Sequence, residues 1–134
     1  MTTIKITLTV DQARILRDAI DLMHRLRLGQ VHEIARVWPF KGTWDENRSR
    51  REAVDVACTY IKRVVFPELD GPGHSYGVGS DLGKDVSRMY ELYKVLDHAL
   101  WQTLPNRPPC DGAGDNPYQL RYSGDDKIPF EVVA

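Results

Sequence analysis

Hydrophobic and polar residues alternate one by one near the N-terminus. Ile4, Ile6, Leu8 and Val10 fall on one face of an extended chain, and polar residues stand between them. A period of two is typical of a half-buried β-strand. The pattern therefore predicts a strand over residues 4–10.

After this strand the apolar spacing changes to three or four residues. Thr9 and Gln12 have the spacing of a capping box, in which two side chains satisfy the free backbone N–H groups of a helix start. The apolar stripe reaches Trp38 and stops at Pro39, which predicts a helix of about 27 residues, roughly 40 Å long. Because a domain of this size has a radius of gyration of only about 14 Å, we expect part of the helix to contact another chain. Gly29, near its middle, indicates either a kink or a close backbone approach.

A second helical stripe is followed by a glycine-rich segment. Thr43 and Glu46 repeat the capping-box spacing and predict a helix over residues 44–66. Residues 67–84 then hold five of the ten glycines. Since long connections inside compact domains are usually functional or disordered, this segment is a candidate site.

The last third of the chain predicts one more helix and a hairpin. The third helix starts with Asp85 as a possible cap and ends before Pro105. A linker over 105–117 precedes two alternating segments, 118–122 and 128–132, which are separated by turn residues and predict a β-hairpin.

Together these elements predict a single α+β domain over residues 1–134. An N-terminal strand and a C-terminal hairpin accompany three helices, the first of them long and partly at an oligomer interface. The chain is 42% hydrophobic and 28% charged, which is typical of a globular protein. Its formal charge of −1 argues against a general nucleic-acid binder. With no apolar run near the roughly 20 residues of a membrane span and no visible secretory leader, we expect a cytoplasmic protein.

The common catalytic and metal-binding motifs are missing from the sequence. It contains no HExxH motif, nucleophile elbow, Walker A motif or complete dinucleotide-binding glycine fingerprint. We therefore expect no catalytic residues, no metal site and no cofactor. Cys58 lies in a helical pattern, where a small core residue is the favoured interpretation.

Charge and ring content indicate a local site for a nucleotide. Residues 14–63 hold 11 Lys and Arg against 7 Asp and Glu, whereas residues 67–134 hold 6 against 11. Arginine suits bidentate phosphate binding, and glycine-rich backbone can offer N–H groups to the same anion. Aromatic rings can stack on a base. Tyr93 and Trp101 fit such a role, but a place in the core is the favoured interpretation for both.

Three segments of the sequence resemble a family of small bacteriophage proteins. Residues 19–34, AIDLMHRLRLGQVHEI, are similar to a motif close to ALDLYSRIGMGQFEEI. Residues 75–79, SYGVG, are similar to that family's SYGI segment, and residues 89–98, MYELYKVLDH, to its AYDLYQVIRH helix. Order and approximate spacing agree. The family resembled includes the first-described type of Thoeris anti-defence protein.

The resemblance implies a protein of the host-cell cytoplasm that acts as a sponge for a signal. It implies dimers, possibly assembled into a hexamer, that bind cyclic ADP-ribose isomers made by bacterial TIR-domain enzymes and do not cleave them. Some relatives also hold cyclic oligonucleotides at a separate site. No membrane and no stable nucleic-acid partner are expected.

The resemblance also implies which residues bind the ligand. Arg25 matches the motif arginine and is the expected phosphate contact, and His98 matches the family histidine. Asp97 stands where the family commonly has arginine, and an acid there repels a pyrophosphate unless it instead accepts a hydrogen bond from a ribose hydroxyl. The glycine segment contributes Ser75, Tyr76, Gly77, Gly79 and Ser80.

The basic helices leave an alternative open. A phage accessory protein that binds DNA or a host protein through its arginine-rich helices has the same charge asymmetry. A salt-dependent mobility shift on duplex DNA, or a co-purifying bacterial protein, favours this alternative over the sponge.

Overall fold

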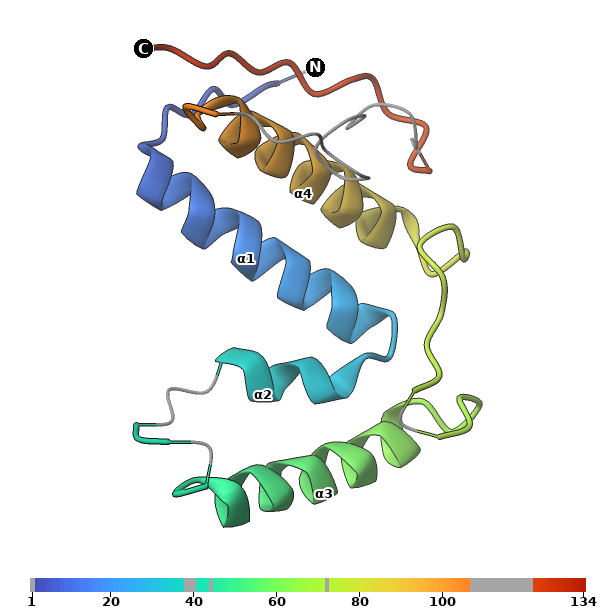
Figure 1. The fold of residues 1–134 in the computed structure, drawn as a ribbon. Helices are drawn as coiled ribbons and strands as arrows, with labels where there is room; N and C mark the ends of the chain where they lie inside the picture. Colours follow the sequence, from blue (N-terminus) through green and yellow to red (C-terminus); the bar gives the residue numbers. More distant parts are fainter. Residues whose placement is uncertain (1, 38–40, 44, 72, 107–121) are drawn as a thin grey trace. The chain divides into compact units, whose positions relative to one another are not determined.

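The described part of the chain is helical in this computed structural model (Figure 1). It comprises all residues except 1, 38–40, 44, 72 and 107–121. The helices are α1 (Val10–Arg27), α2 (Ile34–Val37), α3 (Arg48–Val65) and α4 (Lys84–Gln102), with a short 3-10 helix, η1 (Val31–Glu33), before α2. No strand forms among the described residues, so the predicted α+β class is wrong.

The chain divides into two compact units. Met1–Asp21 together with Gly83–Ala134 form one, which we call the α4 unit, and Leu22–Leu82 form the other, which we call the α3 unit. Helix α1 runs from the first into the second. The expectation of one domain over residues 1–134 stays a prediction.

Helix α1 starts as the capping-box spacing predicts. The backbone N–H of Thr9 donates to the Gln12 side-chain oxygen at 2.9 Å, and the backbone N–H of Gln12 donates to the Thr9 hydroxyl at 3.2 Å. Two of the N–H groups that a helix start leaves unpaired are thereby satisfied. This prediction is confirmed.

The end of α1 corrects the predicted long helix. Gly29 has a φ of +89°, its N–H donates to the Leu26 carbonyl at 3.1 Å, and the N–H of Gln30 donates to the Arg25 carbonyl at 2.9 Å. These two bonds and the left-handed glycine form a Schellman motif, which ends a helix. Helix α1 therefore has 18 residues instead of about 27, and the interface inferred from its excess length loses its basis.

Gly29 also lies against another segment, as one of its two interpretations proposed. A Cβ atom placed on Gly29 would overlap the Leu69 side chain. The neighbouring Leu28 and Val31 are both buried. The chain thus turns sharply at Gly29 and packs against the segment that follows α3.

The predicted N-terminal strand is wrong because no second strand pairs with it. Residues 3–9 are irregular, and Ile4 and Ile6 are 85% and 67% exposed. Alternation gives a segment an apolar face, but a strand also needs a neighbouring backbone for its hydrogen bonds. No such neighbour exists in the described ranges.

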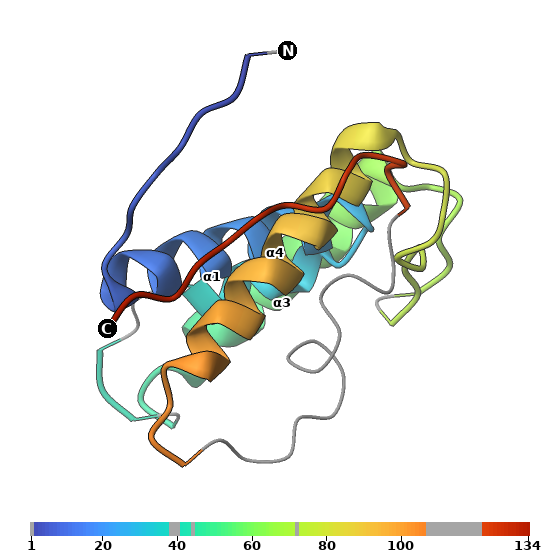
Figure 2. The same cartoon turned by 90° about the horizontal axis from the view of Figure 1, so that it is seen from above.

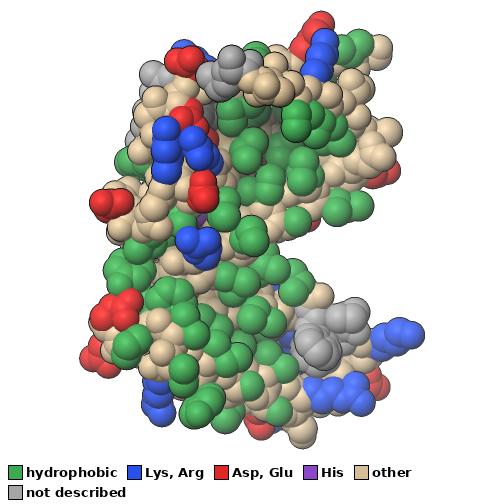
Figure 3. Space-filling view, turned by 180° about the vertical axis from the view of Figure 1, so that it is seen from behind, with side chains coloured by type: hydrophobic (Ala, Val, Ile, Leu, Met, Phe, Trp, Pro, Cys, Tyr) green, Lys and Arg blue, Asp and Glu red, His purple; other side chains and the backbone are tan. Residues whose placement is uncertain are grey.

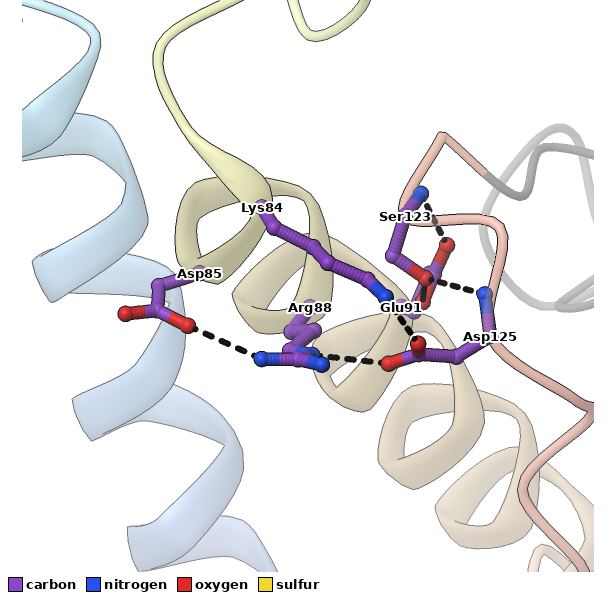
Figure 4. A network of polar contacts seen from close by, with 6 residues as sticks. All are labelled: Lys84, Asp85, Arg88, Glu91, Ser123 and Asp125. Atoms are coloured by element: carbon purple, nitrogen blue, oxygen red, sulfur yellow. Dashed lines mark hydrogen bonds and ion pairs between the residues drawn. The ribbon is translucent and has the colours of Figure 1, made fainter.

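The predicted C-terminal hairpin is also wrong where it can be described. Residues 118–121 lie outside the described residues, and 122–134 contain no strand. The C-terminal segment lies along α4 instead (Figures 1 and 2). Polar side chains on α4 hold it (Figure 4): Glu91 accepts hydrogen bonds from the backbone N–H and hydroxyl of Ser123 at 3.0 and 2.7 Å. Asp125 contacts Lys84 at 2.8 Å and Arg88 at 2.7 Å.

The other two helices differ little from their predicted bounds. Thr43 and Glu46 make both capping-box bonds, at 2.6 and 3.3 Å, but a turn over 45–47 follows and α3 begins at Arg48. Asp85 lies in the first turn of α4, after an N-cap glycine. Cys58 is 2% exposed, which confirms its place in the core. None of the helices, over the residues described, is long and apolar enough to cross a membrane.

Candidate functional site

The Schellman motif at the end of α1 places two polar side chains together. The Arg25 carbonyl and the Gln30 N–H are joined by the backbone bond described above. Their side chains also meet, because Nη1 of Arg25 donates to Oε1 of Gln30 at 3.1 Å. The backbone turn that ends the helix therefore also fixes the position of the Arg25 guanidinium.

The glycine-rich segment joins this turn from the other end of the α3 unit. The backbone N–H of Tyr76 donates to the Leu28 carbonyl at 2.8 Å, and Nε2 of Gln30 donates to the Ser75 hydroxyl at 3.4 Å. Two segments 45 residues apart are thus linked by backbone and side chain. We call Arg25, Gln30, Ser75 and Tyr76 the Arg25–Ser75 cluster.

A buried lysine supports the same segment from α3. Lys62 is 3% exposed, and its Nζ donates to the carbonyl of His74. Because burying a charge without a partner is costly, this hydrogen bond compensates the ammonium and holds the segment before Ser75 against α3. The lysine thereby serves as a positioning residue for the cluster.

The electrostatic surroundings of Arg25 decide how it can meet an anion. Its Nη1 lies 3.9 Å from Oε1 of Glu33, and that carboxylate contacts Arg36 through its other oxygen at 2.5 Å. The shorter contact makes Arg36 the main partner of Glu33. The Arg25 side chain is 35% exposed, so its guanidinium is within reach of a ligand from solution. Of the two Glu33 contacts, the longer one is the one that a phosphate at Arg25 must compete with.

Tyr76 offers an anchored ring. Its hydroxyl donates to Oε1 of Glu68 at 2.5 Å, and its ring lies edge-on to Phe66 with centroids 6.5 Å apart. The hydrogen bond raises the pKa of Tyr76 and lowers the pKa of Glu68. Contacts at both ends reduce the rotational freedom of the ring, which is half-buried. A ring fixed in this way loses little entropy when a flat base stacks on it.

The glycines of the segment are not required by backbone conformation. Neither Gly77 nor Gly79 has a positive φ. The N–H of Ser80 donates to the Gly77 carbonyl at 3.0 Å and closes a turn. That N–H is used inside the turn and does not belong to an anion-binding nest. What the two glycines provide is backbone without side chains next to Ser75 and Tyr76.

The remaining predicted site residues lie in the α4 unit. Asp97 accepts a hydrogen bond from Nη1 of Arg17 at 3.1 Å, which compensates its charge. Nε2 of His98 lies 3.0 Å from the Gln102 amide nitrogen, and its ring lies 5.5 Å from Trp101 and 5.8 Å from Phe130, centroid to centroid. The predicted residues therefore fall into two groups, one in each unit.

Sequence reasoning missed two members of the first group. Gln30 directly follows Gly29, the glycine that ends α1. A Schellman motif at this glycine joins the backbone of Gln30 to that of Arg25, so recognising Gly29 as a helix stop would have indicated Gln30 as a neighbour of Arg25. Lys62 has no comparable signal, since its spacing in α3 does not distinguish it from the exposed cations beside it.

The described residues contain no group of three His, Cys, Asp or Glu side chains placed to hold a metal ion. Comparison of the chain with known protein families, curated proteins and solved structures finds no match.

Proposed function

We propose that this protein binds a cyclic ADP-ribose isomer or a related cyclic nucleotide and sequesters it without cleaving it. One observation carries the proposal. Residues 19–34 and 75–79, two of the segments in which the sequence resembles the Thoeris anti-defence family, meet at the Arg25–Ser75 cluster. Segments that share a resemblance and also share a contact are expected when both contribute to one binding site.

The cluster has the chemistry that such a ligand needs. The Arg25 guanidinium binds a phosphate oxygen, and the side chains of Gln30 and Ser75 exchange hydrogen bonds with ribose hydroxyls or a second phosphate. The Tyr76 ring stacks on adenine. Asp97 and His98, which lie in the α4 unit, remain predicted ligand contacts. Trapping a signal requires tight binding and slow release, so this chemistry needs no acid, base or nucleophile.

Magnitudes set a further condition on the site. Nanomolar capture corresponds to roughly −12 kcal/mol. A hydrogen bond to a charged group contributes about 1.5–3 kcal/mol, and a stacked ring contributes about 1–3 kcal/mol. The cluster alone falls short of the total, so the proposal includes assembly of copies of the chain in the host-cell cytoplasm, in which more of the ligand is buried.

Calorimetric titration with cyclic ADP-ribose tests the proposal. We expect the Arg25→Ala variant to bind at least about tenfold more weakly than the wild type, because it loses a hydrogen bond to a charged group. Arg14→Ala is the matched control: Arg14 lies on the same helix, is 54% exposed and pairs with Asp11, and its loss should leave the affinity unchanged. Equal affinity for wild type and Arg25→Ala would refute the assignment of Arg25.

A further inference from the structure

Helix α3 carries an exposed apolar face. Val56 and Tyr60 are each 70% exposed, Val64 is 63% exposed and Ile61 is 42% exposed. Figure 3 shows such apolar side chains on the surface of the α3 unit. With two exposed alanines they form a continuous strip, which we call the α3 face: Ala53, Val56, Ala57, Tyr60, Ile61 and Val64.

The opposite side of α3 is the one that packs inside its own unit. Cys58 and Lys62 are 2% and 3% exposed, and Thr59 lies 3.1 Å from the His32 ring nitrogen of η1. The packing of the α3 unit therefore uses one side of the helix and does not use the α3 face. Apolar strips of this kind on a surface mark sites of interaction.

The order of residues in the α3 face is symmetric about the midpoint between Cys58 and Thr59. A second α3 laid antiparallel on the first places Ala57 level with Tyr60, Ala53 level with Val64 and Val56 level with Ile61. Each alanine thus meets a large side chain, so that the two surfaces interdigitate. Small residues of the strip therefore face large residues of an antiparallel copy, which makes the α3 face complementary to itself.

Charges beside the strip match in the same arrangement. Glu52 and Arg63 are exposed, and at 100° per residue both fall on the same edge of α3. In an antiparallel pair the same edges of the two helices face each other. Glu52 of one copy and Arg63 of the other are then separated along the helix axis by the rise of about two residues, roughly 3 Å. The two-fold symmetry repeats this ion pair. In a parallel pair this edge faces the opposite edge of the other helix, so Glu52 and Arg63 do not meet.

We infer that the α3 face is the contact between two copies of this chain, packed antiparallel through their α3 helices. A face of three helical turns is at the low end of interface sizes, and Tyr60 at its centre is of the type that dominates such contacts. Dimerisation is therefore expected in the micromolar range. The inference deepens the assembly part of the proposed function and does not involve the Arg25–Ser75 cluster.

Exchanging the charges of Glu52 and Arg63 tests the inference, with the dimer dissociation constant measured by sedimentation equilibrium from low to high micromolar concentration. Glu52→Arg and Arg63→Glu each place like charges across the pair, and each should weaken dimerisation at least about threefold. The double variant restores opposite charges and should return the dissociation constant to the wild-type value. A double variant as weak as the single ones overturns the antiparallel register.

An apolar pair of variants tests the face itself. Tyr60→Glu, at the centre of the strip, should abolish the dimer, whereas Val37→Glu on α2, at a valine that is 57% exposed, should leave it intact. A wild-type protein that is monomeric at every concentration, or a dimer equally unaffected by both substitutions, overturns the inference. A dimer that binds no cyclic ADP-ribose contradicts the proposed function alone, and a monomer that binds it contradicts this interface alone.

Discussion

Replacing Gly29 by alanine tests how the end of α1 is built. Gly29 has a φ of +89°, and a Cβ there would overlap the end of the Leu69 side chain. A left-handed conformation costs an L-residue about 1–2 kcal/mol. Extra atoms in a packed contact cost about 1–3 kcal/mol, with the lower end expected where a flexible side chain can move. We therefore expect Gly29→Ala to lower the free energy of unfolding by about 2–3 kcal/mol.

Two other glycines of the α3 unit separate the conformational effect from the steric one. Gly71 has a φ of +79°, and a Cβ there would meet nothing within 4 Å among the described atoms, so Gly71→Ala should cost only about 1–2 kcal/mol. Gly73 has no positive φ and equally open surroundings in the described part of the chain. Gly73→Ala should be neutral or stabilising by up to about 1 kcal/mol, because alanine restricts the unfolded chain.

Urea unfolding followed by circular dichroism measures all three variants by linear extrapolation. The free energy of unfolding should fall most for Gly29→Ala, less for Gly71→Ala and not at all for Gly73→Ala. A Gly29→Ala protein as stable as the wild type refutes this prediction, and so does an equal loss in Gly29→Ala and Gly73→Ala.

Two further predictions concern single titratable groups. Hydrogen bonds from Arg88 and Lys84 lower the pKa of Asp125 to about 2. Because the pKa in the folded protein lies below the unfolded value, the Asp125 carboxylate stabilises the folded position of the C-terminal segment above about pH 4. This stabilisation is lost as the pH falls toward 2. An NMR titration of the Asp125 carboxyl carbon should show this low midpoint, and a midpoint near 3.8 in the wild type contradicts it. Burial, assisted by the charge of Asp55, raises the pKa of the Cys58 thiol, so iodoacetamide should label it in native protein far more slowly than in urea; equal rates contradict its place in the core.

Local signals in the sequence predicted the helices better than the strands. The Thr9 and Gln12 side chains cap α1 as their spacing predicts, because both partners of a capping box lie within three residues of each other. The strand over 4–10 failed because its alternation specifies no partner backbone. The long first helix failed at Gly29, where the periodic stripe continues through a residue whose conformation ends the helix.

The candidate site was predictable only in part for the same reason. Arg25 and Ser75 belong to separate segments of the sequence, and their link through Gln30 depends on the turn at Gly29. Neither Gly77 nor Gly79 has a positive φ, and anion binding by the N–H groups of this segment stays a prediction. The role of Lys62 could not be predicted, because it depends on the tertiary packing that buries its side chain against the backbone of His74.

The central claim is that the chain traps a cyclic nucleotide intact. Mass spectrometry after incubation of the protein with cyclic ADP-ribose, removal of free ligand and heat denaturation tests this claim most directly. The account predicts that unmodified cyclic ADP-ribose is released in stoichiometric amount from the wild type and from Arg14→Ala, and in much smaller amount from Arg25→Ala. Release of ADP-ribose or another cleavage product, or of no nucleotide from the wild type, contradicts it.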